Sequence, residues 1–451
     1  MVALCAEFVR SRMSRRKEAV NLALRYEALM DQAALAGPDA GFLLVCVLCG
    51  RSPERESANR CAECGGAVDA VHDLGRASIP SDGEPLQRYF DLLPLKNRKS
   101  IIGLGEGNTP CRPATDLGRR VGLPRLVLKI EGDNPTRSTK DRIASLGLSR
   151  FAELGVKRFV MASTGNSSTA YARGVQAVAG MELALFCGYR FRHRLGYPDH
   201  PSVSTYLVEG DFVAAGQVSR RFAARTGAFA EGGFFNLARR EGLKLAYLEA
   251  FDRMDPAPDA VFQAVSSGMG LLGGYKGALE YRRLGRLPRV PRFVAVQQDA
   301  CAPMAHAYRE RAAAIAPRHI VHEPRGPAEA ILRGDPTATY PYIRDLCRES
   351  GGAITAVTEA EIRAARCLLA EDEGVNACNA GAAALAGAVR MRREGGLSAD
   401  DTVLVNLTGA DREDRSAPTR YRVVPPDWAT GPVDWDGPAE TSREAAGSWA
   451  G

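Results

Sequence analysis

Hydrophobic and polar positions follow two alternating patterns along most of the chain. Short apolar runs bounded by polar or glycine-rich residues predict buried strands, and longer stretches with apolar residues at helical spacing predict amphipathic helices. The strands are predicted at 126–130, 159–162, 183–187, 204–208, 260–265, 292–296, 354–357 and 402–407. The helices are predicted from near Lys140 onward and at about 169–178, 213–226, 240–253, 359–370 and 381–392. Strands that alternate with helices indicate a mostly parallel sheet with helices on both faces.

Three of the predicted strands end in polar or glycine-rich loops. The strand at 159–162 is followed by Ser163-Thr164-Gly165-Asn166-Ser167-Ser168, the strand at 260–265 by Ser266-Ser267-Gly268-Met269-Gly270, and the last strand ends in Asn406-Leu407-Thr408-Gly409. In parallel sheets, ligands bind beyond the carboxyl ends of the strands. We therefore expect these loops to line one site.

A single lysine, Lys140, lies near the start of a predicted helix in the segment 133–142. Asn134 is expected to cap this helix and Pro135 to occupy its first position. The positive end of the helix dipole and partial burial would both favour the neutral amine of Lys140. A neutral amine is what Schiff-base chemistry with an aldehyde cofactor needs. Taken alone, a solvated lysine at a helix end explains the pattern better, so the neighbouring loops must decide.

Each of the three loops fits a ligand and also fits an ordinary structural role. The glycines of the second loop would let backbone amides bind a phosphate, but they also suit a tight strand-to-helix turn. A dinucleotide site is the rival ligand site, and it requires an acidic residue where this chain has Gln297-Gln298. The hydroxyls at 163–168 suit either a carboxylate or a helix cap. Thr408 suits either a backbone group or the nitrogen of a pyridine ring.

Composition and charge narrow the class of protein. The 451 residues are enough for two or three domains with substantial cores. A net charge of +6, from 59 basic and 53 acidic residues, is too small an excess to indicate nucleic acid. No apolar run reaches the length of a membrane span, and the first residues lack the apolar block of a secretory signal. We expect a cytoplasmic protein that binds neither membrane nor nucleic acid, with an amphipathic surface helix in its basic N-terminal residues.

Four of the eleven cysteines form two C-x-x-C-G turns, Cys46 with Cys49 and Cys61 with Cys64. Two such turns supply four thiolates around a tetrahedral zinc ion, and a complete thiolate set leaves no open position for catalysis. Two disulfides would need an oxidising compartment, and a redox dithiol needs only one copy of the pair. The spacing therefore predicts a structural zinc site.

The order of these motifs resembles the fold-type II pyridoxal phosphate enzymes, and within them the threonine synthase and cysteate synthase group. The resemblance covers about residues 88–412. Leu93-Pro94 followed by Gly105-Glu106-Gly107-Asn108-Thr109-Pro110 is similar to the opening motif of threonine synthases. Asn134-Pro135-Thr136 leading to Lys140-Asp141-Arg142 resembles the motif whose lysine carries the cofactor. The loop 163–168 and Thr408 fall where the family places further cofactor and substrate contacts.

The resemblance implies a tryptophan synthase beta-like α/β fold with two parallel-sheet lobes, preceded by a small zinc-ribbon-like segment. Together with composition, it divides the chain into an N-terminal helix and linker (1–40), a zinc-ribbon-like segment with four cysteines (41–75), a PLP-binding catalytic region of two interleaved lobes (76–424) and a flexible tail (425–451). By analogy with similar enzymes, we expect a homodimer.

The family's site residues carry over to matching positions of this chain. Lys140 would bind pyridoxal 5'-phosphate covalently and act in catalysis. The other implied cofactor-binding positions are Asn166, Ser267, Gly268, Met269, Gly270, Leu271 and Thr408. The implied substrate-binding positions are Ser163, Thr164, Ser167, Ser168, Asn236 and Arg239. The zinc ligands would be Cys46, Cys49, Cys61 and Cys64, since some members carry a small cysteine-bearing N-terminal segment.

The chain departs from the threonine synthase pattern at two loops. The segment 268–272 lacks the asparagines of the usual phosphate loop, and Cys378-Asn379-Ala380-Gly381 replaces a common Glu-Pro-Ala-Ser. The segments 231–242 and 405–409 look more like the cysteate synthase branch. The resemblance thus implies a PLP-dependent lyase or transferase acting on an amino-acid O-phosphate. We place β-replacement on O-phosphoserine with sulfite first, and threonine synthesis from O-phosphohomoserine and water second.

Five arginines are candidates to bind the departing phosphate, because guanidinium groups match its geometry. They are Arg190, Arg192, Arg194, Arg239 and Arg240. An alternative of another class is a zinc-ribbon protein that binds nucleic acid or a partner and carries a degenerate catalytic scaffold. Such a scaffold would have no need of Lys140.

Overall fold

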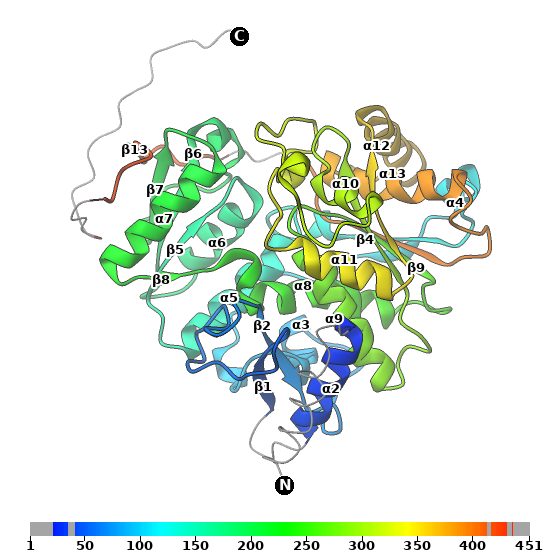
Figure 1. Cartoon of the computed structure of the whole chain (residues 1–451), viewed down its shortest axis with the longest axis horizontal. Coiled ribbons are helices and arrows are strands. Elements are labelled where there is room, and N and C mark those ends of the chain that lie inside the picture. The colour runs from blue at the N-terminus through cyan, green and yellow to red at the C-terminus, as the bar shows by residue number, and fades with distance from the viewer. Residues whose placement is uncertain (1–20, 35–40, 413–415, 431–434, 436–451) are drawn as a thin grey trace. The chain divides into compact units, whose positions relative to one another are not determined.

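The computed structural model of the chain describes residues 21–34, 41–412, 416–430 and 435. These residues divide into two compact units, the first built from residues up to 154 together with 234–411, and the second from 155–233 and the residues after 411. Figure 1 labels many of the elements of both units. Within the described residues, no helix is both long enough and apolar enough to cross a membrane. The expected surface helix of the basic N-terminus falls in 1–20, which lies outside the described residues.

A six-stranded sheet forms the centre of the first unit, in the strand order β11-β10-β9-β12-β4-β3. The strands are β3 (Cys111–Pro113), β4 (Leu126–Ile130), β9 (Ala260–Ala264), β10 (Arg292–Gln298), β11 (Ala353–Val357) and β12 (Val403–Leu407). Every neighbouring pair is parallel except β3 with β4. The antiparallel β3 was not predicted, because three partly polar residues leave no apolar run.

Helices cover both faces of this sheet. The helices of the first unit are α2 (Leu22–Ala34), α3 (Pro85–Arg88), α4 (Thr115–Arg120), α5 (Lys140–Glu153), α8 (Leu237–Phe251), α9 (Met269–Arg283), α10 (Pro303–Arg309), α11 (Tyr340–Glu349), α12 (Glu359–Glu373) and α13 (Asn379–Arg393). Alternate strand residues enter two separate cores: Val261 packs with α8 and α9, whereas Ala260 and Phe262 pack with α12 and α13. Burial on both faces explains why these strands read as continuous apolar runs.

The N-terminal segment is part of the first unit. Strands β1 (Phe42–Cys46) and β2 (Val68–His72) form an antiparallel hairpin, and α2 packs against β2, α9 and α11 (Figure 1). The Tyr26 hydroxyl of α2 donates to Asp69 of β2 at 2.8 Å. The backbone N–H of Ala67 donates to the Tyr342 hydroxyl of α11 at 2.9 Å. These buried contacts tie the cysteine-bearing segment to the body of the unit.

The second unit is a smaller α/β layer around the parallel sheet β13-β7-β6-β5-β8. Its elements are β5 (Arg158–Ala162), α6 (Asn166–Gln176), β6 (Glu182–Gly188), β7 (Val203–Val208), α7 (Phe212–Thr226), β8 (Phe229–Ala230) and β13 (Arg422–Val424). Helix α6 connects β5 to β6, towards the β13 edge of the sheet, whereas α7 connects β7 to β8, towards the opposite edge. Right-handed crossovers therefore place these two helices on opposite faces.

The predicted strands and the later helices are all present, with ends within three residues of the expected ones. The flexible tail expected at 425–451 stays a prediction, but its described residues include two tryptophans that contact the rest of the second unit. Trp428 stacks on Phe222 with ring centroids 5.7 Å apart, and Trp435 contacts the same ring at 5.6 Å. Two tryptophans bury large apolar areas, which offsets the disorder that the Pro- and Gly-rich composition favours. The rest of the expected tail lies outside the described residues.

Candidate active site

Three central strands of the first sheet end at the same edge. Strands β4, β12 and β9 are neighbours and parallel, so their carboxyl ends point in one direction. The loop to Lys140 follows β4, Thr408 follows β12, and the loop 266–270 follows β9. The topology therefore brings these three loops of the first unit to one edge, which is where ligands bind in parallel sheets.

The expected helix cap at Asn134 is wrong. Helix α5 begins at Lys140 with Thr139 before it, and residues 131–133 form a separate short helix, η3 (Glu131–Asp133). The turn between them is fixed by Asp141, which accepts from the Thr136 N–H at 2.7 Å and from its hydroxyl at 2.8 Å. The Thr139 N–H donates to the Thr408 carbonyl at 3.0 Å. The backbone that carries Lys140 is thus held directly against the end of β12.

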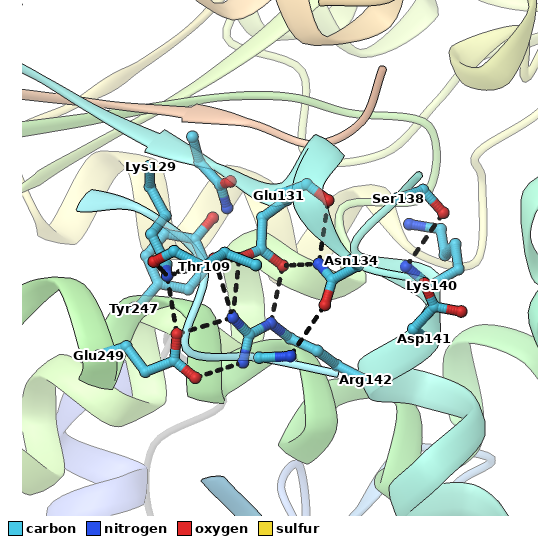
Figure 2. A network of polar contacts seen from close by, with 12 residues as sticks. Thr109, Lys129, Glu131, Asn134, Ser138, Lys140, Asp141, Arg142, Tyr247 and Glu249 are labelled. Carbon is cyan, nitrogen blue, oxygen red and sulfur yellow. Dashed lines mark hydrogen bonds and ion pairs between the residues drawn. The ribbon is translucent and has the colours of Figure 1, made fainter. Parts of the chain in front are cut away.

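Asn134 instead belongs to a buried polar network beside the lysine (Figure 2). Its amide donates to the Glu131 carbonyl at 2.9 Å, and its oxygen accepts from the Gly107 N–H at 2.9 Å. Thr109 donates its hydroxyl to Glu131 at 2.6 Å. The glycine-rich motif at 103–110 and the lysine motif at 134–142 therefore occur together because they are hydrogen-bonded to each other.

Four buried charges form the centre of this network (Figure 2). Arg142 donates to Glu131 at 2.7 and 2.8 Å and to Glu249 of α8 at 2.7 and 2.8 Å, and Lys129 of β4 donates to Glu249 at 2.7 Å. Burial alone would raise the pKa of Glu249, but Arg142 and Lys129 outweigh it and lower that pKa to about 2. Two cations and two anions balance, which is the condition for keeping charges in a core.

The Lys140 amine is shifted toward its neutral form. Burial and, after it, the guanidinium of Arg239 lower the pKa of Lys140 to about 8, against the opposing effects of Glu131 and Cys378. Arg239 lies in the first turn of α8 and is buried. Ammonium groups lose hydration on burial and are repelled by a nearby cation, so both effects favour the reactive amine. The sequence predicted the direction of this shift but not the contribution of Arg239.

The loop from Ser267 to Leu271 has the shape of a cradle for an anion. Gly268 has φ +81° and precedes Met269, the first residue of α9. A Cβ on Gly268 would lie 2.3 Å from Ile343, and one on Gly270 would lie 2.9 Å from the Gln263 amide. Only glycine fits these positions, and the helix start presents backbone N–H groups to an anion. The loop therefore fits a phosphate even without the family's asparagines.

The serine-rich loop 163–168 belongs to the second unit. Gly165 precedes α6 with φ +151°, and Asn166 is the first residue of that helix. The Ser163 hydroxyl accepts from the Ser168 N–H at 3.3 Å, so part of this loop serves as a helix cap. Ser167 and Ser168 are buried, and the Asn166 oxygen accepts from Arg412 at 2.7 Å. Arg412 was not predicted, because no motif marks it.

The remaining predicted positions lie on α8 and in the second unit. Asn236 caps α8 by accepting from the Ala238 N–H at 3.0 Å. Arg240 is fully buried and donates to the carbonyls of Phe234 and Val68, which ties α8 to β2. These structural contacts count against Arg240 as a ligand of a departing phosphate. Arg190, Arg192 and Arg194 lie on η4 (Tyr189–Arg194) of the second unit.

The four N-terminal cysteines converge at the end of the β1–β2 hairpin. The Sγ atoms of Cys46 and Cys64 are 3.4 Å apart, and those of Cys49 and Cys61 are 3.6 Å apart. Tetrahedral zinc with Zn–S bonds of about 2.3 Å places its sulfurs about 3.8 Å apart. Gly50 and Gly65 take the left-handed conformation that closes each C-x-x-C-G turn. The four thiols thus lie close enough together to share one metal ion.

The chain belongs to the pyridoxal-phosphate dependent enzyme family, whose model matches residues 102–409. It is a fold-type II PLP-dependent lyase of the threonine synthase and cysteate synthase group, as the following relatives show. Threonine synthase of Methanocaldococcus jannaschii is 30% identical over 390 residues, 84% of this chain and 95% of the relative. Cysteate synthase of Methanococcoides burtonii is 29% identical over 372 residues, 79% of this chain and 87% of the relative.

Solved structures confirm the tryptophan synthase beta-like fold. The processed form of threonine deaminase isoform 2 from Solanum lycopersicum aligns with a TM-score of 0.56 at 17% identity, over 74% of this chain and 92% of that one. Maize serine racemase aligns with a TM-score of 0.56 at 19% identity, over 68% of this chain and 89% of that one. At this identity the likeness concerns the fold alone. Family membership sets aside the alternative of a scaffold without catalysis.

Proposed function

We propose that the enzyme replaces the phosphate of an O-phosphorylated amino acid, with O-phosphoserine and sulfite as substrates and L-cysteate as product. The observation that carries this proposal is the Lys140 amine, whose pKa is lowered by burial and by the guanidinium of Arg239. A low-pKa amine serves as the base at the substrate's α-carbon, and a guanidinium close enough to act on that amine suits a departing phosphate. Both relatives named above carry names of enzymes in this group.

The residues present fit pyridoxal phosphate, and we assign them as follows. Lys140 would hold the aldehyde carbon, and the backbone at Ser267, Gly268, Met269, Gly270 and Leu271 would bind the phosphate. Thr408 would hydrogen-bond the pyridine nitrogen without protonating it, and Asn166 would bind the phenolic oxygen. Ser163, Thr164, Ser167 and Ser168 would bind the substrate carboxylate, and Asn236 and Arg239 the leaving phosphate.

When bound, pyridoxal phosphate supplies a ring that accepts the electron pair left at the α-carbon. The substrate's amine would take the place of Lys140 at the aldehyde carbon, and the freed Lys140 amine takes the α-proton. The bond between Cβ and the phosphate oxygen then breaks, and its electron pair leaves on inorganic phosphate, where Arg239 compensates the charge. The sulfur lone pair of sulfite forms the new bond to Cβ, and Lys140 returns the proton to the α-carbon. O-phosphoserine and sulfite are thereby converted to cysteate and phosphate.

Threonine synthesis from O-phosphohomoserine and water is the second candidate. It is favoured by the 30% identity to a threonine synthase over 95% of that relative. The segments 231–242 and 405–409, which look more like the cysteate synthase branch, favour the first candidate. The same lysine would serve both reactions, but threonine synthesis requires a second proton removal, from Cβ.

The two candidates are separated by supplying each substrate to the PLP-loaded enzyme. O-phosphoserine with sulfite is expected to release phosphate and yield cysteate, identified by mass spectrometry. The Lys140→Ala variant should lose the visible band and turnover, and Lys157→Ala, at an exposed lysine, should keep both. Phosphate release from O-phosphohomoserine alone would reverse our preference between the two.

We also propose one structural zinc ion per chain, bound by Cys46, Cys49, Cys61 and Cys64. Four thiolates complete a tetrahedral site, so this ion would stabilise the hairpin and take no part in catalysis. The homodimer expected by analogy stays a prediction. Light scattering on the loaded enzyme would measure the molar mass against 48.4 kDa for one chain.

A further inference from the structure

We propose that Arg412 is a positioning residue that fixes the amide orientation of Asn166. This inference rests on the proposed function, in which Asn166 donates to the phenolic oxygen of the cofactor. Arg412 would act through Asn166 and would not touch the cofactor itself. It would ensure that the NH2 group of the asparagine, and not its oxygen, faces the cofactor.

The hydrogen bonds of Arg412 identify which end of the Asn166 amide faces it. Its Nη2 donates to the Asn166 Oδ1 at 2.7 Å, and its Nη1 donates to the Arg194 carbonyl at 3.0 Å. A guanidinium carries five N–H donors and no acceptor. The amide atom that faces it must therefore be the oxygen, which leaves both amide N–H donors on the other side.

Two glycines make room for Arg412 and for its neighbour Arg194, one glycine for each side chain. A Cβ on Gly196 would lie 3.2 Å from Arg412 Nη1 and 3.4 Å from its Cδ. A Cβ on Gly165 would lie 3.1 Å from the Arg194 guanidinium carbon. The Gly196 N–H is anchored by the buried Thr169 hydroxyl of α6 at 3.1 Å. Three segments of the second unit, at 165–169, 194–196 and 412, thus close around the Asn166 amide.

A reversed amide would be opposed at both ends. Its NH2 group would face the donors of Arg412, and its oxygen would face the electron-rich phenolic oxygen. If a serine or threonine hydroxyl contacted the asparagine instead of Arg412, the amide could take either orientation, because a hydroxyl both donates and accepts hydrogen bonds. A guanidinium removes that freedom. Arg412 therefore preorganises Asn166 before the cofactor arrives.

The test measures cofactor binding rather than turnover. Apoprotein is titrated with pyridoxal phosphate, and the visible band and its pH dependence are recorded. Arg412→Met, which keeps the length and removes the donors, is expected to bind roughly threefold to tenfold more weakly and to shift the pH midpoint of the band. Arg412→Lys, which retains a donor, should lie between this variant and the wild type.

Two further variants separate positioning from a general structural effect. Asn166→Asp keeps the acceptor for Arg412 but removes the donor, so adding Arg412→Met to it should cause little further loss. Arg173→Met is the matched control, since Arg173 donates to the Gly196 carbonyl at 2.9 Å. It should bind the cofactor like the wild type.

Three results would overturn the inference: unchanged binding and an unchanged band in Arg412→Met, equal losses in Arg173→Met, or fully additive losses with Asn166→Asp. Thermal unfolding of each apoprotein shows which variants fold. If Arg412→Met does not fold, Arg412→Lys carries the same comparisons. Failure of the wild type to take up the cofactor would overturn the proposed function and this inference with it.

Discussion

At the scale of single residues, Lys140 depends on neighbours that are remote in sequence. Burial alone favours the neutral amine, and Arg239, almost one hundred positions later, adds a second effect of the same sign. Glu131 opposes both, but Arg142 and Lys129 already neutralise much of its charge. The pKa of the amine is therefore set by its burial first and by a balance of nearby charges second.

Replacing Arg239 with glutamine should raise the pKa of the free Lys140 amine, because a cation that disfavours the ammonium is lost. Less of the amine is then neutral at a given pH, so the pH midpoint for cofactor uptake should lie above that of the wild type. Borohydride trapping of the cofactor adduct across pH measures this midpoint. Arg125→Gln, at an exposed arginine, should leave it unchanged. An unmoved midpoint in Arg239→Gln would contradict this account.

At the scale of elements, charged networks join helices and strands that apolar packing alone would leave less precisely aligned. Arg142 of α5 contacts both Glu131, after β4, and Glu249 of α8. All three side chains are fully buried. Such a set adds little net stability, yet loss of one member leaves an uncompensated charge in the core. The network therefore fixes how α5 meets β4 and α8.

Arg142→Met should lower the free energy of unfolding by about 3–5 kcal/mol, because two buried carboxylates lose their shared partner. Guanidinium unfolding followed by circular dichroism measures the change. Arg125→Met provides the exposed control and should change stability by less than about 0.5 kcal/mol. Equal stabilities of the two variants would show that the network is dispensable.

The two C-x-x-C-G turns are the second feature that shapes the first unit at the scale of elements. Gly66, between the second turn and β2, approaches so closely that a Cβ there would lie 2.9 Å from the Cys46 Sγ. The hairpin ends are thus shaped around four sulfurs. Reduced thiols make only weak hydrogen bonds, so the proposed zinc ion would add most of the cohesion between the four sulfurs.

Metal analysis should find one zinc per chain, and a strong chelator should lower the melting temperature by several degrees. Cys61→Ser should lose the metal and show the same lowered melting temperature without chelator. Cys367→Ser, at an exposed cysteine outside the cluster, should behave like the wild type. A chain that melts identically with and without chelator, and carries no metal, would contradict the zinc site.

At the scale of the whole molecule, the N-terminal segment is integral to the first unit. His72 of β2 lies within 4.8 Å of Glu241 and Glu280, a donor set that could suit a metal ion. Lys244 lies 2.5 Å from Glu241 and 2.9 Å from Glu280, and Lys276 contacts both carboxylates as well. Two ammonium groups therefore balance these carboxylates. Burial lowers the pKa of His72 to about 3, which keeps the imidazole neutral beside them.

A chain that begins at residue 76 should not fold, because α8 and α9 would expose these charges and the apolar surface that α2 and β2 cover. Circular dichroism and gel filtration would show unfolded or aggregated protein. A chain that begins at residue 21 keeps every described element of the segment and should fold like the full chain. A monodisperse, cofactor-binding protein starting at residue 76 would show that the segment is separable.

The sequence by itself determined the order of the main parallel strands and of several helices, the lysine, the glycine-bounded loops and the clustering of the four N-terminal cysteines. Each of these is local: an apolar run, a left-handed glycine or a fixed spacing is written within a few adjacent residues. The predicted helix cap at Asn134 was wrong, because an asparagine that caps a helix and one that accepts a buried hydrogen bond from Gly107 look alike in sequence. Lys129 did leave a trace, as a charge inside an apolar strand.

Only the tertiary structure decided which charges meet. Arg239 and Arg240 are adjacent in sequence, yet one influences Lys140 and the other is buried against β2. Arg412 donates to Asn166, which lies 246 positions earlier in the chain, and no sequence motif indicates this contact. Ion pairs and amide orientations depend on distances between segments that are remote in the chain, and a single sequence carries no record of those distances. The order of elements is local physics, whereas the electrostatics of the site follows from the completed fold.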